Sequence, residues 1–436
     1  MDDKGQILVV SYYLPPKNHI ASMRVGGICK YLSELGWDII VLTADHPTSS
    51  NQRYNIVSSE VPKGFVKKAM DKYRAEVSSK GEERGSNEGS PIKTQKATSN
   101  LIKKKFKDVA RFLRDEIVNY PDNKRLWCPN GIKQGEKIIE NEKISCIISS
   151  SGPFTCHRIA SQLSTKYELP WIADFRDWWT QNPYRNHTKI RTLIEKRMEI
   201  KTINPADQII TVSDPIAEDL SDLHNRNVKA ILSGYDSSEY PEVSLNDTFT
   251  IIYPGQFYRG KRNPELLFEA VSNLVSKNII GEENIEIAFY GDLHQWIADL
   301  AEQYRIRNCI SARERVDKKK VLEEERRSHC LLSLHWDDKR AEGGYTGKIF
   351  EYLGARRPII SITPPPVVEE LLANTGAGES FHEVNSLEKW LHNQYHTFQE
   401  SGEVVYDVNS DERSKYTQLR MAKEFEEIIM SEIGKM

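Results

Sequence analysis

A glycine-rich turn, a lysine and a glutamate follow one another in GGYTGKIFEYLGARRPIIS, residues 343–361. The glycines Gly343, Gly344 and Gly347 allow the backbone to approach a ligand closely, because they carry no side chain. Lys348 and Glu351 lie three residues apart and share one face of the amphipathic helix that the pattern predicts. A lysine there suits a phosphate, and a glutamate suits a pair of ribose hydroxyls, for which a carboxylate is a bidentate acceptor. The alternative is an ordinary surface pair of opposite charges.

A second loop in the same half of the chain offers the same chemistry. YPGQFYRGKRNPE, residues 253–265, places Arg259, Lys261 and Arg262 ahead of a helix that we expect to begin at Asn263 or Pro264. Helix-end amides and guanidinium groups both place donors where a diphosphate is most negative. Both loops follow strands of one predicted sheet, so they should open at the same edge. We therefore interpret them as one diphosphate site; the alternative is a pair of solvated basic turns.

Alternating strand-like and helix-like segments must position these loops. From about residue 248, TFTIIYPG, IEIAFYGD, LLSLHW and RPIISIT are typical of strands, and NPELLFEAVSNLVSK, HQWIADLAEQYRI and KKVLEEERRSHC of helices. The first half alternates in the same way, beginning with the strand QILVVSYY and a helix that we expect Ser22 to cap. Such alternation predicts doubly wound parallel sheets, and two patterns of similar length predict two Rossmann-like domains. DERSKYTQLRMAKEFEEIIM predicts a final amphipathic helix.

The bulk composition excludes several classes of protein. At 436 residues the chain is long for a single core, which favours two domains. Its 39% hydrophobic and 28% charged residues predict a globular protein, and a formal charge of −3 disfavours a nucleic-acid partner. The six scattered cysteines contain no C-x-x-C pair and the amino terminus does not resemble a signal peptide, so we expect a cytoplasmic protein. No apolar run approaches the roughly 20 residues of a membrane span.

Residues 50–118 break the alternation. Residues 50–100 are polar, rich in Ser, Gly and Lys and without periodicity, which predicts a long mobile insertion. LIKKKFKDVARFLRDEIV, residues 101–118, predicts a basic amphipathic helix. Two interpretations stay open for this helix: loose association with an anionic membrane surface, or packing on its own domain.

The stretches GGYTGKIFEYLGARRPIIS and YPGQFYRGKRNPELLFEA together resemble the donor-binding half of family 4 glycosyltransferases. ILVVSYYLPPKNHIASMRVGGICKYLSELGWDIIVLT, SSSGPFTCHRIA, WIADFRDWW, IITVSDPIAEDL and SGYD are similar to the strands and loops of the family's acceptor half. The resemblance spans nearly the whole chain except about residues 50–125. It implies the α/β fold called GT-B, in which two Rossmann-like domains with doubly wound parallel sheets face a cleft. The implied limits are 1–235 for the acceptor domain, 236–410 for the donor domain and 411–436 for a helix returning to the amino-terminal domain.

The resemblance also implies roles in the donor half. Arg262, with Lys261 or Arg259 nearby, and Lys348 would hold the donor diphosphate, and Glu351 would bind the donor ribose. The family usually has another glutamate seven intervening residues before this one. Here the nearest, Glu342, has eight residues between, so the amides of the two glycines that follow it are the alternative sugar contacts. The implied donor-binding residues are Gly255, Arg259, Lys261, Arg262, Gly343, Gly344, Tyr345, Thr346, Gly347, Lys348 and Glu351.

In the acceptor half, ADFRDWW resembles the loop that reaches the reaction centre. Asp174 and Asp177 are therefore catalytic candidates together with Arg262 and Lys348, and Arg176 would orient the two carboxylates. Structural caps are the alternative role for these aspartates. The other candidates on the acceptor side are Ala21, Ser22, Arg24 and His157. For the histidine, a place in the core or as a cap is an equal alternative.

The implied reaction transfers a glycosyl group from a nucleotide-diphosphate sugar to an acceptor hydroxyl with retention of configuration. Bacterial surface polysaccharide or glycan synthesis is the implied setting, with a sugar or lipid-linked acceptor. No cofactor is expected, and no metal, because the chain contains no Asp-x-Asp motif. A nucleotide-sugar epimerase of the same fold and a catalytically inactive scaffold are the alternatives. A dinucleotide oxidoreductase is disfavoured, since neither half carries G-x-G-x-x-G after its first strand.

Overall fold

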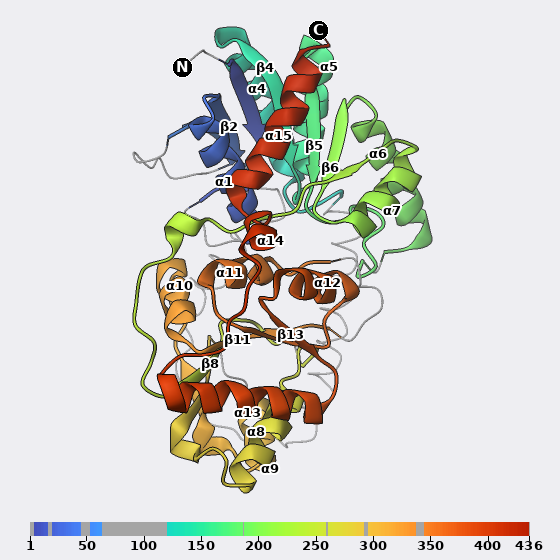
Figure 1. Cartoon of the computed structure of the whole chain (residues 1–436). Coiled ribbons are helices and arrows are strands. Elements are labelled where there is room, and N and C mark those ends of the chain that lie inside the picture. Colours follow the sequence, from blue (N-terminus) through green and yellow to red (C-terminus); the bar gives the residue numbers. More distant parts are fainter. Residues whose placement is uncertain are drawn as a thin grey trace, which may run out of the picture.

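The computed structural model shows two α/β domains (Figure 1) and describes residues 4–15, 20–44, 53–62, 120–185, 187–258, 260–291, 295–336 and 344–435. Most of the predicted insertion and the whole basic helix 101–118 lie outside these residues. Within the described ranges, no helix combines the length and the apolar character needed to cross a bilayer.

A parallel sheet forms the amino-terminal domain, and its seven described strands run in the order β3-β2-β1-β4-β5-β6-β7. Both faces of the sheet are covered by apolar side chains. Alternate residues of β1 point to opposite faces: Leu8 and Val10 belong to one core, and Ile7 and Val9 belong to another. The strands are β1 (Gln6–Val10), β2 (Asp38–Ala44), β3 (Asn55–Ser59), β4 (Ile144–Ser150), β5 (Trp171–Phe175), β6 (Gln208–Thr211) and β7 (Lys229–Ala230). The helices are α1 (Ile20–Glu34), α4 (Cys128–Asn141), α5 (Thr155–Tyr167), α6 (Lys189–Ile203) and α7 (Asp214–His224).

The carboxyl-terminal domain repeats this plan with the strand order β10-β9-β8-β11-β12-β13, again entirely parallel. In Figure 1, α11 and α12 lie on the side of the sheet next to the amino-terminal domain, and α8, α9 and α13 lie on the far side. The strands are β8 (Phe249–Tyr253), β9 (Ile285–Tyr290), β10 (Ile310–Arg313), β11 (Cys330–Leu334), β12 (Ile359–Ile362) and β13 (Gly378–Phe381). The helices are α8 (Glu265–Ser276), α9 (Gln295–Gln303), α10 (Lys318–Arg327), α11 (Gly347–Ala355), α12 (Pro366–Thr375) and α13 (Val384–Ser401).

The chain crosses between the domains twice, and the two crossings lie side by side. The Tyr235 amide donates to the Tyr416 carbonyl at 2.9 Å, and the Gln418 amide donates to the Tyr235 carbonyl at 2.9 Å. The neighbouring Gly234 leaves no room for a side chain, because a Cβ there would lie 2.3 Å from the carbonyl carbon of Thr417. The two connections therefore form one hydrogen-bonded junction. The predicted domain limits, 1–235, 236–410 and 411–436, stay predictions.

The last helices return to the amino-terminal domain, which confirms the expected architecture. After α14 (Ser410–Ser414), α15 (Gln418–Ile433) runs along α1 across the first sheet (Figure 1). Its buried residues Met421, Phe425 and Ile429 join the core that α1 forms with Val25 and Leu32. Helix α15 thus completes the core of the first domain.

Two local expectations were wrong. Asn55–Ser59 belongs to the sheet, not to the insertion: it forms edge strand β3, paired in parallel with β2. Ser22 does not cap the first helix, because α1 begins at Ile20 and already contains Ser22 as a buried residue.

Candidate functional site

Loops at the carboxyl ends of both sheets meet at the domain boundary. Tyr184, in the loop after β5, packs edge-on against Trp336, which follows β11, with 4.9 Å between ring centroids. Tyr258, in the loop after β8, contacts the same indole at 5.6 Å. The ammonium of Lys261 lies 4.3 Å from the Trp336 centroid and 5.9 Å from that of Tyr184. The loops that parallel α/β sheets use for ligands thus lie together here.

The guanidinium of Arg262 lies in the same region, next to the aromatic side chains around Trp336. Its guanidinium lies 4.6 Å from the centroid of the exposed Tyr258 ring, and its buried Nε has no hydrogen-bond partner. Burial and, secondarily, the charge of Arg262 lower the pKa of His335 to about 3. Among the described residues no carboxylate lies within 4.0 Å of Arg262 or of Lys261. Both cations are therefore available to an anion.

Lys348 occupies the first turn of α11, two residues after Thr346 at the helix N-cap. The Thr346 side chain makes no capping hydrogen bond, while its carbonyl accepts from the Ile349 amide at 3.1 Å. No ion pair within 4.0 Å engages Lys348 in the described part of the chain. Glu351, one turn later, is half-buried, and burial raises the pKa of its carboxyl although the nearby lysine lowers it. The surface ion pair that was the alternative for Lys348 and Glu351 does not form a direct salt bridge.

Glu325 of α10 is a carboxylate that the sequence analysis missed. Its side chain is fully buried, and neither carboxylate oxygen has a hydrogen-bond partner. Burial, followed by the charge of Glu351, raises its pKa well above the usual value, while Lys348 and Lys318 oppose the shift. A signal was present: Glu325 follows the buried Leu322 by three residues, so both share the inward face of α10.

The other residues predicted to bind the donor differ in where they lie: some pack within the domain, some lie in loops, and some are outside the described residues. Gly255 is needed for packing, because a Cβ there would lie 2.4 Å from the Tyr253 ring. Tyr345 is half-buried and packs 5.4 Å from the Phe350 ring, which points to a structural contact. Gly344 lies in the loop before α11, and Gly347 is the first residue of that helix. Arg259, Glu342 and Gly343 lie outside the described residues.

Asp174 lies in the sheet, as the second-to-last residue of the strand before the loop in which it was expected. It belongs to β5, is fully buried and binds Arg24 of α1 through Nη2 at 2.9 Å and Nε at 3.1 Å. Ser150 Oγ donates to its second oxygen at 2.6 Å. Arg24 also approaches Ser233 Oγ at 3.3 Å, beside the junction between the domains. The pair is therefore a buried structural link, and we assign neither residue to substrate contact.

Asp177 remains accessible in the loop after β5. Its side chain accepts from the Trp178 amide at 2.8 Å and from Asn182 Nδ2 at 3.2 Å. Although the residue is exposed, desolvation by the surrounding loop raises the pKa of its carboxyl. Arg176 turns instead toward the loop after β4, donating to the carbonyls of Ser151 and Gly152. It therefore braces two loops, and its charge acts on both neighbouring aspartates, Asp174 and Asp177.

His157 is a core residue. It is fully buried on α5, its Nδ1 lies 2.7 Å from Ser149 Oγ, and its ring is 4.6 Å from that of Phe175. Burial lowers its pKa to about 3, so the imidazole is neutral at physiological pH. Ser22 is also buried on α1, and Ala21 belongs to the same helix.

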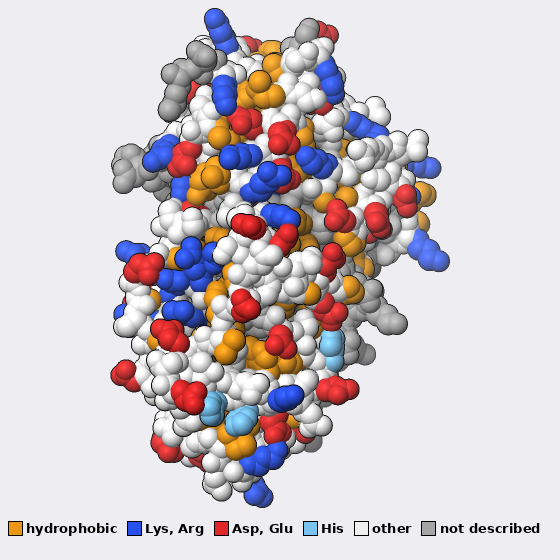
Figure 2. Space-filling view, viewed as in Figure 1, with side chains coloured by type: hydrophobic (Ala, Val, Ile, Leu, Met, Phe, Trp, Pro, Cys, Tyr) orange, Lys and Arg blue, Asp and Glu red, His pale blue; other side chains and the backbone are white. Residues whose placement is uncertain are grey.

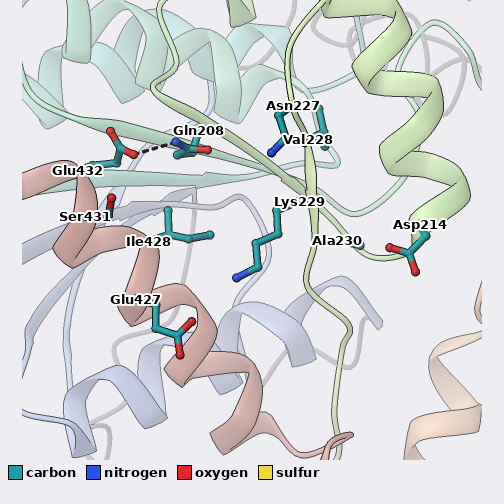
Figure 3. Close-up of a pocket in the computed structure, with 10 residues that line it drawn as sticks. All are labelled: Gln208, Asp214, Asn227, Val228, Lys229, Ala230, Glu427, Ile428, Ser431 and Glu432. Carbon is teal, nitrogen blue, oxygen red and sulfur yellow. Dashed lines mark hydrogen bonds between the residues drawn. The ribbon is translucent and has the colours of Figure 1, made fainter.

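A hollow on the outer surface of the amino-terminal domain contains none of the predicted site residues (Figure 3). It has a volume of about 450 Å³ and lies between the β6–β7 edge of the sheet and α15. Gln208 bridges the two walls by donating to Glu432 Oε1 at 2.8 Å. Within the described ranges no group of three or more His, Cys, Asp or Glu side chains could hold a metal ion. The expected lack of a metal stays a prediction.

No protein-family model and no curated protein sequence matches this chain. Solved structures do match over nearly the full length. Sucrose-phosphate synthase from Thermosynechococcus elongatus is 10% identical with a TM-score of 0.62, covering 99% of this chain and 100% of that one. Anabaena Alr3699/HepE in complex with UDP and glucose is 10% identical with a TM-score of 0.58, covering 98% and 100%.

A third match is a Listeria monocytogenes protein described as a UDP-N-acetylglucosamine 2-epimerase. It is 12% identical with a TM-score of 0.52, covering 99% of this chain and 97% of that one. These likenesses and the two parallel sheets show that the chain has the GT-B fold.

Proposed function

We propose that this protein is a retaining glycosyltransferase that transfers a sugar from a nucleotide-diphosphate donor to an acceptor hydroxyl. One observation carries the proposal: Arg262 precedes α8, Lys348 lies in the first turn of α11, and neither has a carboxylate within 4.0 Å among the described residues. Both helices follow strands of one parallel sheet, at the edge where such sheets bind ligands. Two cations without a carboxylate partner, beside helix amino termini, suit a diphosphate.

In the proposed reaction the bond between the anomeric carbon and the diphosphate oxygen breaks, and a bond to the acceptor oxygen forms on the same face. The acceptor proton passes to the departing phosphate. Arg262 and Lys348 stabilise the charge that develops on the diphosphate. Glu351 accepts the two ribose hydroxyls of the donor. Asp177 is the carboxylate left for the acceptor side, since the protein itself uses Asp174 in an ion pair.

The proposed setting is cytoplasmic synthesis of a bacterial surface polysaccharide or another glycan, with a sugar or lipid-linked acceptor. The six free, buried thiols are compatible with a reducing compartment. Loose membrane association through residues 101–118 is part of this proposal. It rests on the sequence of this segment alone, because the segment lies outside the described residues. No cofactor or metal is proposed.

Screening nucleotide sugars and nucleoside diphosphates for thermal stabilisation, and then for turnover, tests the donor site. A ligand at 100 times its Kd stabilises the folded state by about 2.7 kcal/mol, which a melting curve resolves. Arg262→Ala and Lys348→Ala should each lower turnover by about 10²-fold or more, as loss of a charge-stabilising donor does. Lys319→Ala is the matched control, because Lys319 is an exposed lysine of α10 in the same domain. Wild-type turnover in both purified variants, or no stabilisation by any nucleotide, contradicts the proposal.

A nucleotide-sugar epimerase is the second candidate, favoured by the similarity to the Listeria monocytogenes structure. An epimerase converts its nucleotide sugar without any acceptor, whereas a transferase needs one for transfer. Incubating the protein with the donor alone and analysing the sugar nucleotide separates the two. Accumulation of an epimeric nucleotide sugar identifies the epimerase.

A further inference from the structure

Helix α6 exposes a row of large apolar side chains. Ile190, Leu193, Ile194 and Ile200 are 74%, 53%, 48% and 38% exposed. At 100° per residue, these four positions lie within an arc of about 120° on one side of the helix. Nine large hydrophobic side chains are exposed in the described part of the chain, and four belong to this one helix. Such concentration on a single face indicates an interaction surface.

The same face of α6 carries positive charge and no negative charge. Its exposed charged residues are Lys189, Lys196, Arg197 and Lys201. On the side of the molecule seen in Figure 2, acidic side chains accompany the basic ones in both domains, including beside the basic group at the left near α10. Long Lys and Arg side chains can keep their charges at a polar interface while their aliphatic parts lie against apolar groups.

The two acidic residues of α6 are held inside the domain. Glu195 is buried and pairs with Arg191 at 2.6 Å and Arg185 at 3.1 Å. Glu199 is fully buried and accepts from the Thr180 amide at 3.0 Å. Rotating the helix to hide its apolar row would expose the partners of these carboxylates and break buried ion pairs. The orientation of the apolar and cationic face is therefore fixed by the fold.

We propose that this face of α6 docks the protein on an anionic phospholipid membrane. An apolar row flanked by three lysines and one arginine has the composition that binds at the interface of anionic bilayers. A second copy of this chain is a poorer occupant, because a two-fold contact would place the lysines of one α6 against those of the other. Helix α7 lies next to α6 (Figure 1), and its exposed Glu218 and Asp219 repel anionic lipid. The inference is independent of the proposed function, since it needs only the surface of this helix.

Sedimentation of the full-length protein with vesicles tests the docking. Binding is expected to vesicles of phosphatidylglycerol and phosphatidylcholine, to weaken with salt, and to be lost with phosphatidylcholine alone. Each cation at an anionic surface strengthens binding about fivefold, so Lys196→Gln with Arg197→Gln should weaken it about 25-fold. Ile190→Ser with Ile194→Ser should also weaken it. Both pairs are exposed, so the melting temperature should not fall.

A matched control removes two lysines from other surfaces. Lys319 and Lys423 are exposed on α10 and α15, and Lys319→Gln with Lys423→Gln should leave vesicle binding within twofold of wild type. Equal loss in this control and in the α6 variants overturns the proposal, because net charge alone would then explain binding. Binding that survives the α6 changes but is lost when the lysines of residues 103–105 become glutamine also overturns it, in favour of the basic segment. A third result would also overturn the proposal: the wild type is a dimer that binds no vesicles, and Ile190→Ser with Ile194→Ser converts it to a monomer.

Discussion

Replacing Glu325 by glutamine should stabilise the protein, and increasingly so as the pH rises. The wild-type side chain is fully buried on α10 with neither oxygen hydrogen-bonded. Burial and the neighbouring Glu351 raise its pKa well above the ordinary value. Glutamine has nearly the same shape and no charge, so the substitution removes the charge without leaving a cavity.

The sign and size of the effect follow from this burial. Because the folded-state pKa is raised, the folded protein binds more protons than the unfolded chain above the unfolded glutamate pKa of about 4.3. The free energy of unfolding of the wild type therefore falls as the pH rises from there through the folded-state pKa. An unpartnered buried group costs about 1–3 kcal/mol, more when charged. For a domain of this size, each kcal/mol of stability changes the melting temperature by about 2–4 °C. The melting temperature of Glu325→Gln should therefore be roughly 2–12 °C above that of the wild type at alkaline pH.

Thermal melts of wild type and variant between pH 4.5 and pH 9 measure the effect. The neighbouring Glu324 provides a control with the opposite sign. Desolvation alone would raise its pKa, but hydrogen bonds from Lys320 at 2.7 Å and Tyr290 at 2.8 Å lower it. Glu324→Gln should therefore destabilise the protein at neutral pH and lose its effect as the pH falls. If Glu325→Gln melts at or below the wild-type temperature throughout the range, the assignment of an unpaired buried carboxylate is wrong.

Four further outcomes are expected. Asp174→Asn should lower the free energy of unfolding by about 3–5 kcal/mol in denaturant titrations, because it leaves the buried Arg24 charge unpaired; a loss below 1 kcal/mol would refute the ion-pair reading. Gly234→Ala should cost about 1–3 kcal/mol by forcing the two crossings apart. Gly152→Ala, where no atom lies within 4 Å of the added methyl, is its control in the same melts. Nucleotide-induced stabilisation should decline as the pH falls through the raised pKa of Glu351, where the ribose acceptor is protonated, and Glu351→Gln should flatten that profile. The six buried thiols should not react with a thiol reagent until the protein unfolds; rapid labelling of the native protein would contradict their burial.

The sequence predicts the sheets well, because their strands are short apolar runs covered on both faces. β1, β2, β8 and β12 lie where such runs were expected. β3 was not predicted, because Asn55–Ser59 is an edge strand with one buried residue and lacks the long apolar run that marks a central strand. α6 was not predicted because its pattern is inverted: Ile190, Ile194 and Ile200 face outward. Glu195 and Glu199 are buried against partners that include Arg185 and Thr180 in the loop before the helix.

The site is predicted less evenly than the fold. The position of Arg262 just before a helix and of Lys348 in the first turn of another could be predicted, because each helix follows a recognisable strand. Asp174 could not, since its partner Arg24 lies 150 residues earlier in the chain and no local pattern reports that pairing. His157 was undecided for the same reason: its neighbours Ser149 and Phe175 become contacts only when the strands assemble.

The return of α15 to the first sheet affects how the chain matures on the ribosome. Phe425 and Ile429 complete a core whose other members come from the first strands and α1. The nascent amino-terminal domain therefore has the face of its sheet that α1 covers only partly buried until residues 418–433 have been made. The second domain meets no such delay, since its own strands and helices end before that segment emerges. The half of the chain that is made first is thus the half that finishes folding last.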